Sequence, residues 1–308
     1  MRAAECRPCE RRVRVVSIEM NIQWFPGHMT KARRMMEANV RLVDAVCEIV
    51  DARIPESSRN PDVTELVGAK PRMLILNRVD QADVGLTKAW AAYYRTLGYA
   101  VVETDSQSGR GVEAFYPALL TLLQEKIEQN RAKGMVGKPL RAMIVGIPNV
   151  GKSSFINRVA KRKAAIASDK PGVTRGKQWI VVGEGLELLD TPGILWPRFD
   201  SQTVGENLAF TGAVRDQIMD RETLAANLLL RLRELYPERI EERYKFTPDP
   251  EANGYDLLET AARKRGFLIR GGEADIERMA VQLLDEFRGG KLGRITLERP
   301  PALVKNND

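Results

Sequence analysis

Apolar and polar positions follow two regular patterns along the first two thirds of the chain. Short runs rich in valine, isoleucine and leucine alternate with stretches in which apolar residues recur at helical spacing. The predicted strands are residues 46–50, 72–76, 99–103, 142–145, 178–182 and 186–189. The predicted helices are residues 31–43, 63–67, 86–97, 112–133 and one that opens at 154–159. This alternation indicates an α/β fold built on a parallel, doubly wound sheet.

The last third of the chain is helical and poor in strands. Helices are predicted at residues 207–219, 221–235, 254–264 and 274–287. The last of these carries one apolar stripe, which favours core packing over binding of a partner: Ile276, Met279, Ala280, Leu283, Leu284 and Phe287. We therefore expect an α/β domain at 20–200 and an all-helical C-terminal domain at 203–299, flanked by a disordered extension at 1–19 and a loose tail at 300–308.

Residues 146–153 read G-I-P-N-V-G-K-S between a predicted strand and a predicted helix. That context makes G-x-x-x-x-G-K-[ST] a phosphate-binding loop, and an ordinary glycine turn is the alternative. The glycines let backbone N–H groups point at a β-phosphate, and the following helix adds the positive end of its dipole. We expect Lys152 to bind the β- and γ-phosphates and the Ser153 hydroxyl to bind Mg²⁺.

Asn77-x-x-Asp80 follows another predicted strand. The Asp80 carboxylate can accept hydrogen bonds from the ring N–H and the exocyclic amino group of guanine, a pair that adenine does not offer. Asn77 can connect the base to the phosphate loop, and Ser106, after the next strand, can brace the base-binding loop. The motif predicts GTP or GDP as ligand and speaks against the alternative of a P-loop kinase or ATPase.

Asp190-x-x-Gly193 is the third motif at a strand end. Asp190 can hold Mg²⁺ through water, the Gly193 N–H can reach a γ-phosphate, and Thr174 can complete the Mg²⁺ shell in the triphosphate state. A Ras-like chain has its phosphate loop before its base motif, whereas here the base motif comes first. This order predicts a circularly permuted Ras-like P-loop GTPase domain, whose switch leads through residues 197–203 into the helical domain.

Charge and composition indicate which partners the protein can contact and in which compartment it acts. The net charge is +7, and cations cluster after the phosphate loop at Lys161, Arg162, Lys163, Lys170, Arg175 and Lys177. They can contact RNA, or they can form a solvated face. Three cysteines favour a reducing compartment, and Cys6-x-x-Cys9 lacks the second pair of a zinc site. No apolar run is long enough to span a membrane, so we expect a cytoplasmic protein without membrane contact.

Over residues 20–298 the chain resembles the circularly permuted GTPases of the ribosome biogenesis GTPase A type. The motifs that carry the resemblance lie at residues 24–29, 50–55, 146–154, 171–174, 190–193 and 289–294. The resemblance implies GTP hydrolysis stimulated by the large ribosomal subunit, and a helical domain that contacts ribosomal RNA. The residues expected to bind GTP are Asn77, Arg78, Val79, Asp80, Asp105, Ser106, Asn149, Val150, Gly151, Lys152, Ser153, Ser154, Thr174 and Gly193; those expected to bind Mg²⁺ are Ser153, Thr174 and Asp190.

The chain departs from related patterns at two positions. Arg78 stands where the resembled family usually has lysine, so we expect guanine preference with altered affinity. Ile194 stands where Ras-like enzymes have a glutamine that orients water, so another group must act in hydrolysis. The resemblance points to His28 as the catalytic residue, with a purely structural histidine as the alternative. Asn149 matches a position that holds K⁺ in potassium-dependent GTPases, or it only caps the loop.

Together with these motifs, the resemblance implies an assembly factor for the large ribosomal subunit. A monomer would bind the precursor of that subunit, its RNA and its proteins, in the GTP state, and hydrolysis would release it. Hydrolysis should be slow without the subunit, since the glutamine is missing. The alternative is a GTP-controlled switch that acts on a non-ribosomal RNA.

Overall fold

The computed structural model describes residues 29–164, 179–182, 185–191, 193, 195, 199, 201–214 and 220–301. His28, Thr174, the extension at 1–19 and most of the predicted tail lie outside the described residues, and the domain boundaries stay predictions. In the part of the chain that the structure describes, no helix combines the length and the apolar character that a membrane crossing requires.

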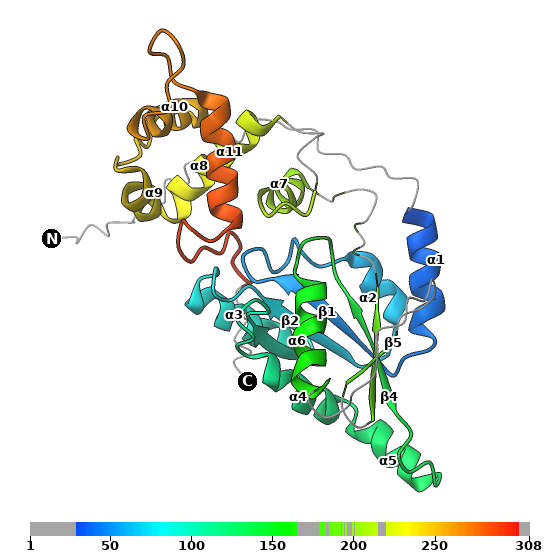
Figure 1. The fold of residues 1–308 in the computed structure, drawn as a ribbon. Coiled ribbons are helices and arrows are strands. Elements are labelled where there is room, and N and C mark those ends of the chain that lie inside the picture. The colour runs from blue at the N-terminus through cyan, green and yellow to red at the C-terminus, as the bar shows by residue number, and fades with distance from the viewer. Residues whose placement is uncertain are drawn as a thin grey trace, which may run out of the picture.

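One six-stranded sheet organises the first domain (Figure 1). Its strands are β1 (Ala45–Asp51), β2 (Arg72–Asn77), β3 (Ala100–Thr104), β4 (Leu140–Val145), β5 (Trp179–Val181) and β6 (Leu186–Asp190). They lie in the order β3-β2-β1-β4-β6-β5, and all pairs are parallel except β5 with β6. The predicted α/β class is confirmed, and the sheet is parallel as predicted except for β5, which pairs antiparallel with β6. The permuted order places the base-motif strand β2 before the phosphate-loop strand β4.

Alternate side chains of each strand point to opposite faces, and helices bury both faces. On one face Ile49, Ile75 and Ile144 pack with Phe115 and Phe155, from helices α4 (Phe115–Leu122) and α6 (Lys152–Ala164). The other face carries α1 (Met29–Val40), α2 (Pro61–Val67) and α3 (Val84–Thr96). The apolar runs read as strands are therefore buried on both sides.

The segment predicted as one long helix over residues 112–133 is helical, but the prediction of a single continuous helix is wrong. The segment forms a 3₁₀ turn, η1 (Val112–Ala114), followed by α4 and then α5 (Gln124–Ala132). Pro117 has no N–H to donate to the carbonyl of Glu113, so an α-helix that began at Val112 would lack this bond. Pro117 instead lies in the first turn of α4, where its N–H is not needed. Leu123, with φ −102° and ψ 13°, separates α4 from α5. The apolar periodicity continued across both breaks and concealed them.

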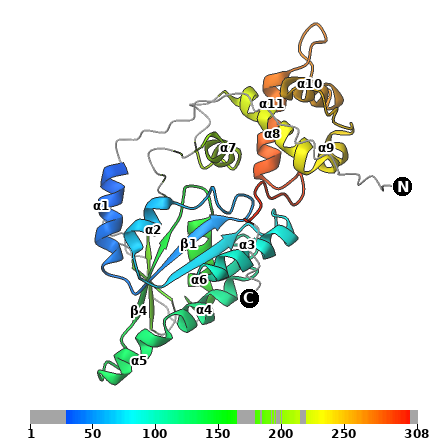
Figure 2. The ribbon, with the colours of Figure 1, turned by 180° about the vertical axis from the view of Figure 1, so that it is seen from behind.

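The second domain is a group of helices around α8 (Arg221–Leu235). Most residues of α8 are buried, because α7 (Gln202–Phe210), α9 (Pro237–Tyr244), α10 (Gly254–Lys264) and α11 (Ile276–Arg288) pack around it (Figure 2). The predicted all-helical C-terminal domain is confirmed, and the stripe on α11 is core. The helix predicted at 207–219 instead begins at Gln202, capped by Ser201, and ends before Gly212, whose φ is +75°. Helix α9 was not predicted.

Residues 289–299, called the C-terminal strap here, return from α11 to the sheet. Backbone bonds join Ile295 N to Gln81 O at 2.9 Å and Leu297 N to Arg53 O at 2.8 Å. The Glu298 carboxylate then accepts hydrogen bonds from the backbone of Glu56 and Ser57 and from the Asn207 side chain. The helical domain is thus fastened directly onto the loops that follow β1 and β2.

Candidate functional site

The predicted motifs meet at one edge of the sheet. Parallel pairing sets Asp51 beside Asn77 and Asn77 beside Thr104, while Ile144 of β4 pairs with Asp190 of β6. These positions are the carboxyl ends of the strands, where ligands bind in open parallel sheets. The helical domain lies beyond the same edge (Figure 1).

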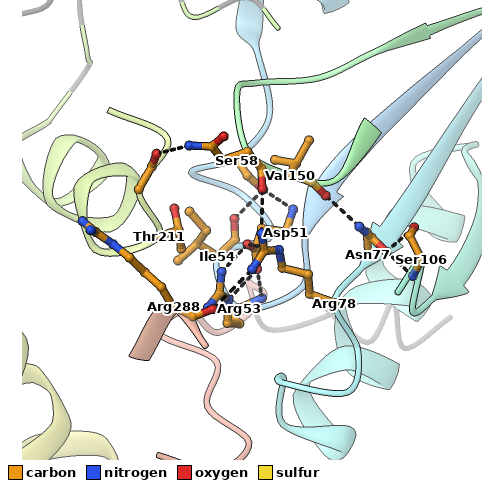
Figure 3. A network of polar contacts seen from close by, with 12 residues as sticks. Asp51, Arg53, Ile54, Ser58, Asn77, Arg78, Ser106, Val150, Thr211 and Arg288 are labelled. Carbon is orange, nitrogen blue, oxygen red and sulfur yellow. Dashed lines mark hydrogen bonds and ion pairs between the residues drawn. The ribbon is translucent and has the colours of Figure 1, made fainter. Parts of the chain in front are cut away.

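Asn77 connects the base motif to both neighbouring loops. Its side chain is buried, and Nδ2 donates to Val150 O of the phosphate loop at 2.7 Å. Oδ1 accepts from Ser106 N at 3.0 Å, Ser106 Oγ at 2.7 Å and Thr104 Oγ1 at 3.1 Å (Figure 3). Asn77 and Ser106, which the sequence predicted to bridge and to brace the loops, therefore belong to one continuous network, and their roles toward a base stay predictions.

The loop after β3 is held in a fixed turn. Asp105 Oδ1 accepts from Gln107 N at 2.9 Å and Ser108 N at 3.2 Å. Burial opposes ionisation, but these bonds and one from the Ser108 hydroxyl outweigh it and lower the pKa of Asp105. From α6, Arg158 donates to the carbonyls of Ser106 and Gln107. The loop expected against a guanine base is thus fixed by its own side chains and by the helix that follows the phosphate loop.

The phosphate loop leads from β4 into α6 as the motif predicts. Gly151 has φ +94°, and a Cβ there would lie 2.5 Å from Asn77 Nδ2, so only glycine fits. Val150 is buried, while Ser153 and Ser154 at the start of α6 are exposed. Lys152 Nζ donates to Gly146 O and Ile147 O, both at 3.2 Å. Burial lowers the pKa of Lys152, and the charge of Asp190 opposes that shift.

Asp190 and Gly193 lie against this loop. Asp190 is half-buried, and burial raises the pKa of its carboxyl although the Lys152 charge opposes the shift. A Cβ on Gly193 would lie 2.9 Å from Lys152 Nζ and 3.0 Å from Pro148 Cα. A hydroxyl at Ser153 and a carboxylate at Asp190 are hard oxygen donors of the kind that Mg²⁺ prefers, so the residues present fit this ion.

The remaining predicted residues are Arg78, Val79 and Asp80 of the base motif and Asn149 of the phosphate loop. Arg78, with φ +63°, donates from Nη2 to Asn149 O at 2.8 Å. Val79 N donates to Thr104 O at 3.3 Å, which ties the motif to β3. The half-buried Asp80 carboxylate accepts no hydrogen bond from the described part of the chain. Burial lowers the pKa of the nearby Arg78, and the charges of Asp51 and Asp80 oppose that shift. Asn149 is exposed, and its Nδ2 donates to Gly212 O of the helical domain at 2.6 Å.

Sequence comparisons agree with this geometry. A protein named ribosome biogenesis GTPase A from Bacillus cereus is 47% identical over 281 residues, which cover 91% of this chain and 95% of that protein. The protein of the same name from Thermotoga maritima is 32% identical and covers 91% of this chain. This chain belongs to the ribosome biogenesis GTPase A family. The chain is also similar, at 34% identity and over 90% of each chain, to mitochondrial ribosome-associated GTPase 1 of Mus musculus.

Two further comparisons fit the ribosome biogenesis GTPase A family. A family model described as 50S ribosome-binding GTPase matches residues 141–244, which include the phosphate loop but not the base motif that precedes it. Among solved structures, GNP-bound YlqF from T. maritima matches with a TM-score of 0.61 at 29% identity, over 89% of this chain and 100% of that one. The GDP-bound YlqF structure matches with a TM-score of 0.63 at 28% identity.

Asp51 and Arg53 were given no role by the sequence. Both are buried, and Arg53 forms two bonds to the Asp51 carboxylate, from Nε at 2.9 Å and from Nη2 at 2.7 Å. Arg53 Nη1 also donates to Phe287 O at 3.0 Å, at the end of α11. Two opposite charges directly after a buried strand were the available signal, because charges in such a position must find a partner.

Proposed function

We propose that this GTPase binds the precursor of the large ribosomal subunit in its GTP state and is released on hydrolysis. The family and its relatives support a GTPase of ribosome biogenesis. The helical domain is hydrogen-bonded to the loops that follow β1 and β2. This attachment supports the proposal that its contact with ribosomal RNA depends on the bound nucleotide.

The Asn77 network is the observation that carries guanine-nucleotide binding at this site. Its bonds to Val150 and Ser106 join the three loops that would surround the base and the phosphates. The half-buried Asp80, on the same turn, is the carboxylate expected to accept from guanine. An adenine nucleotide would leave that carboxylate unpaired, which supports GTP over ATP.

Each residue of the site has a role in binding GTP. Lys152 would exchange the carbonyls of Gly146 and Ile147 for phosphate oxygens. Ser153 and Asp190, with Thr174, would hold Mg²⁺, which neutralises charge on the phosphates when bound. Gly193 N–H would face the γ-phosphate. Asn149 Oδ1 would hold K⁺, and His28 would act on the attacking water.

Turnover of GTP in potassium and in sodium buffer, with and without purified large subunits, tests the enzymatic part. The protein alone should hydrolyse GTP slowly, and large subunits should raise this rate. The increase should be larger in potassium than in sodium buffer. His28→Ala should lose the stimulation while keeping subunit binding. Stimulation that survives His28→Ala would assign the histidine a structural role, and equal rates in both buffers would remove K⁺ from the proposal.

Co-sedimentation tests the ribosomal part. With a non-hydrolysable GTP analogue the chain should pellet with large subunits, and with GDP it should remain in the supernatant. Equal sedimentation in both states would refute release by hydrolysis. Absence of subunit binding, together with nucleotide-dependent binding of another RNA, would establish the non-ribosomal alternative instead.

A further inference from the structure

Arg78 contacts both domains at once. Its Nη2 donates to Asn149 O of the phosphate loop at 2.8 Å, and its Nη1 donates to Arg288 O, the last residue of α11, at 3.4 Å. Its Nε lies 3.7 Å from Asp51 Oδ2. Figure 3 shows the guanidinium between the loop after β1 and the end of α11. One side chain of the guanine motif thus touches the phosphate loop and the helical domain.

The end of α11 is a place where cations are needed. The last carbonyls of a helix have no partners within it and carry the negative end of its dipole. Arg53 supplies one donor, bonding to Phe287 O at 3.0 Å and Arg288 O at 3.4 Å, and Arg78 supplies a second. The two arginines share the buried Asp51 carboxylate, which fixes their spacing. Movement of either guanidinium therefore removes a partner from the end of α11.

A second contact reaches the same domain from the phosphate loop. Asn149 Nδ2 donates to Gly212 O at 2.6 Å, in the turn that ends α7. Arg288 donates to Phe210 O at 3.1 Å and Ala209 O at 2.9 Å, so the turn and the end of α11 are held together. The base motif and the phosphate loop thus contact the same part of the helical domain, where the turn after α7 meets the end of α11.

We propose that Arg78 is a positioning residue that couples nucleotide binding to the placement of α11 and the C-terminal strap. A nucleotide that orders the base motif and the phosphate loop would fix Arg78 from both sides, and Arg78 would then hold the carbonyl of Arg288. By linkage, a partner that holds α11 in place would raise nucleotide affinity by the same factor. The proposal rests on guanine-nucleotide binding in the proposed function, and it requires no ribosome.

The guanidinium is essential to this role. Its planar fork offers separate nitrogens to Asn149 O and Arg288 O, whereas a lysine presents one compact ammonium. A lysine at position 78 can keep the phosphate-loop contact and lose the helical one. This route runs through the base motif, so it is independent of the linker that leads from Gly193 into α7.

Hydrogen–deuterium exchange of the full chain, with and without saturating GDP, tests the coupling. In the wild-type protein GDP should slow exchange of amides in residues 283–294 by about fivefold or more, the lower range of ordinary coupling. In Arg78→Lys, measured at a GDP concentration that saturates that variant, the effect should fall below about twofold. Arg95→Lys is the matched control, because Arg95 is exposed and, among the described residues, its guanidinium pairs only with the Glu103 carboxylate and Val101 O.

Arg78→Met is the second variant, since it keeps an unbranched side chain and has no donor. It should lose both the coupling and part of the affinity for GDP, and thermal unfolding checks that both variants are folded. Full GDP-dependent protection of residues 283–294 in either variant would overturn the proposal, as would its absence in the wild-type protein. Failure of the wild-type protein to bind GDP would instead refute the proposed function itself.

Discussion

Replacing Asn77 with alanine removes the residue that joins the three loops of the site. The buried side chain makes four hydrogen bonds, to Val150 O, Ser106 N, Ser106 Oγ and Thr104 Oγ1. At about 1 kcal/mol each, their loss should lower the free energy of unfolding by about 4 kcal/mol. The affinity for GDP should fall by about tenfold or more, since the loops lose their common anchor. Urea denaturation and titration with a fluorescent GDP measure the two effects.

Asn77→Asp separates the contacts. A carboxylate keeps an acceptor for Ser106 and Thr104 but turns a second oxygen toward Val150 O, where the amide donated at 2.7 Å. It should therefore detach the phosphate loop and lose GDP affinity with a smaller loss of stability than Asn77→Ala. Asn39→Ala is the control, because Asn39 is also buried and its Oδ1 has no hydrogen-bond partner in the described part of the chain. Equal destabilisation by Asn77→Ala and Asn39→Ala, or GDP affinity in Asn77→Ala within about threefold of wild type, would refute the reasoning.

Three further perturbations follow from the contacts. Gly193→Ala should slow GTP turnover more than it weakens GDP binding, because the added Cβ would lie 3.0 Å from Pro148 Cα and displace the segment expected at the γ-phosphate. Single-turnover assays measure the first effect, and titration with a fluorescent GDP measures the second. Gly254→Ala should cost about 1–3 kcal/mol in thermal unfolding, since its Cβ would lie 2.7 Å from Ala226 O where α10 crosses α8. Burial opposes ionisation of Glu286, but hydrogen bonds from Arg243, Gln282 and Tyr244 outweigh it and lower its pKa to about 2. Its stabilising effect is therefore present above its ordinary pKa of 4.5 and is lost as the pH falls toward 2, so Glu286→Gln should flatten the acid side of an unfolding profile measured by urea denaturation.

The amino-acid pattern was enough to predict the α/β class, a parallel sheet and the convergence of the motifs. The parallel arrangement holds for five of the six strands, and the antiparallel pairing of β5 was not predicted. Strands buried on both faces give continuous apolar runs, and parallel strands bring their carboxyl ends to one edge whatever their order in the chain. For the same reason the permuted order of the base motif and the phosphate loop could be recognised from the sequence. The phosphate loop was equally legible, because its glycines, lysine and serine act through contiguous backbone.

The contact between the helical domain and that edge of the sheet could be seen only in the folded chain. Arg78 and the Arg288 carbonyl are 210 positions apart in sequence, and Asn149 and Gly212 are 63 apart, so no local periodicity relates them. The break at Leu123 and the early start of α7 could not be predicted either, because apolar residues can keep helical spacing where the backbone leaves the helical conformation. Local chemistry specifies which residues can bind a nucleotide, whereas packing between distant segments specifies which of them also touch the second domain.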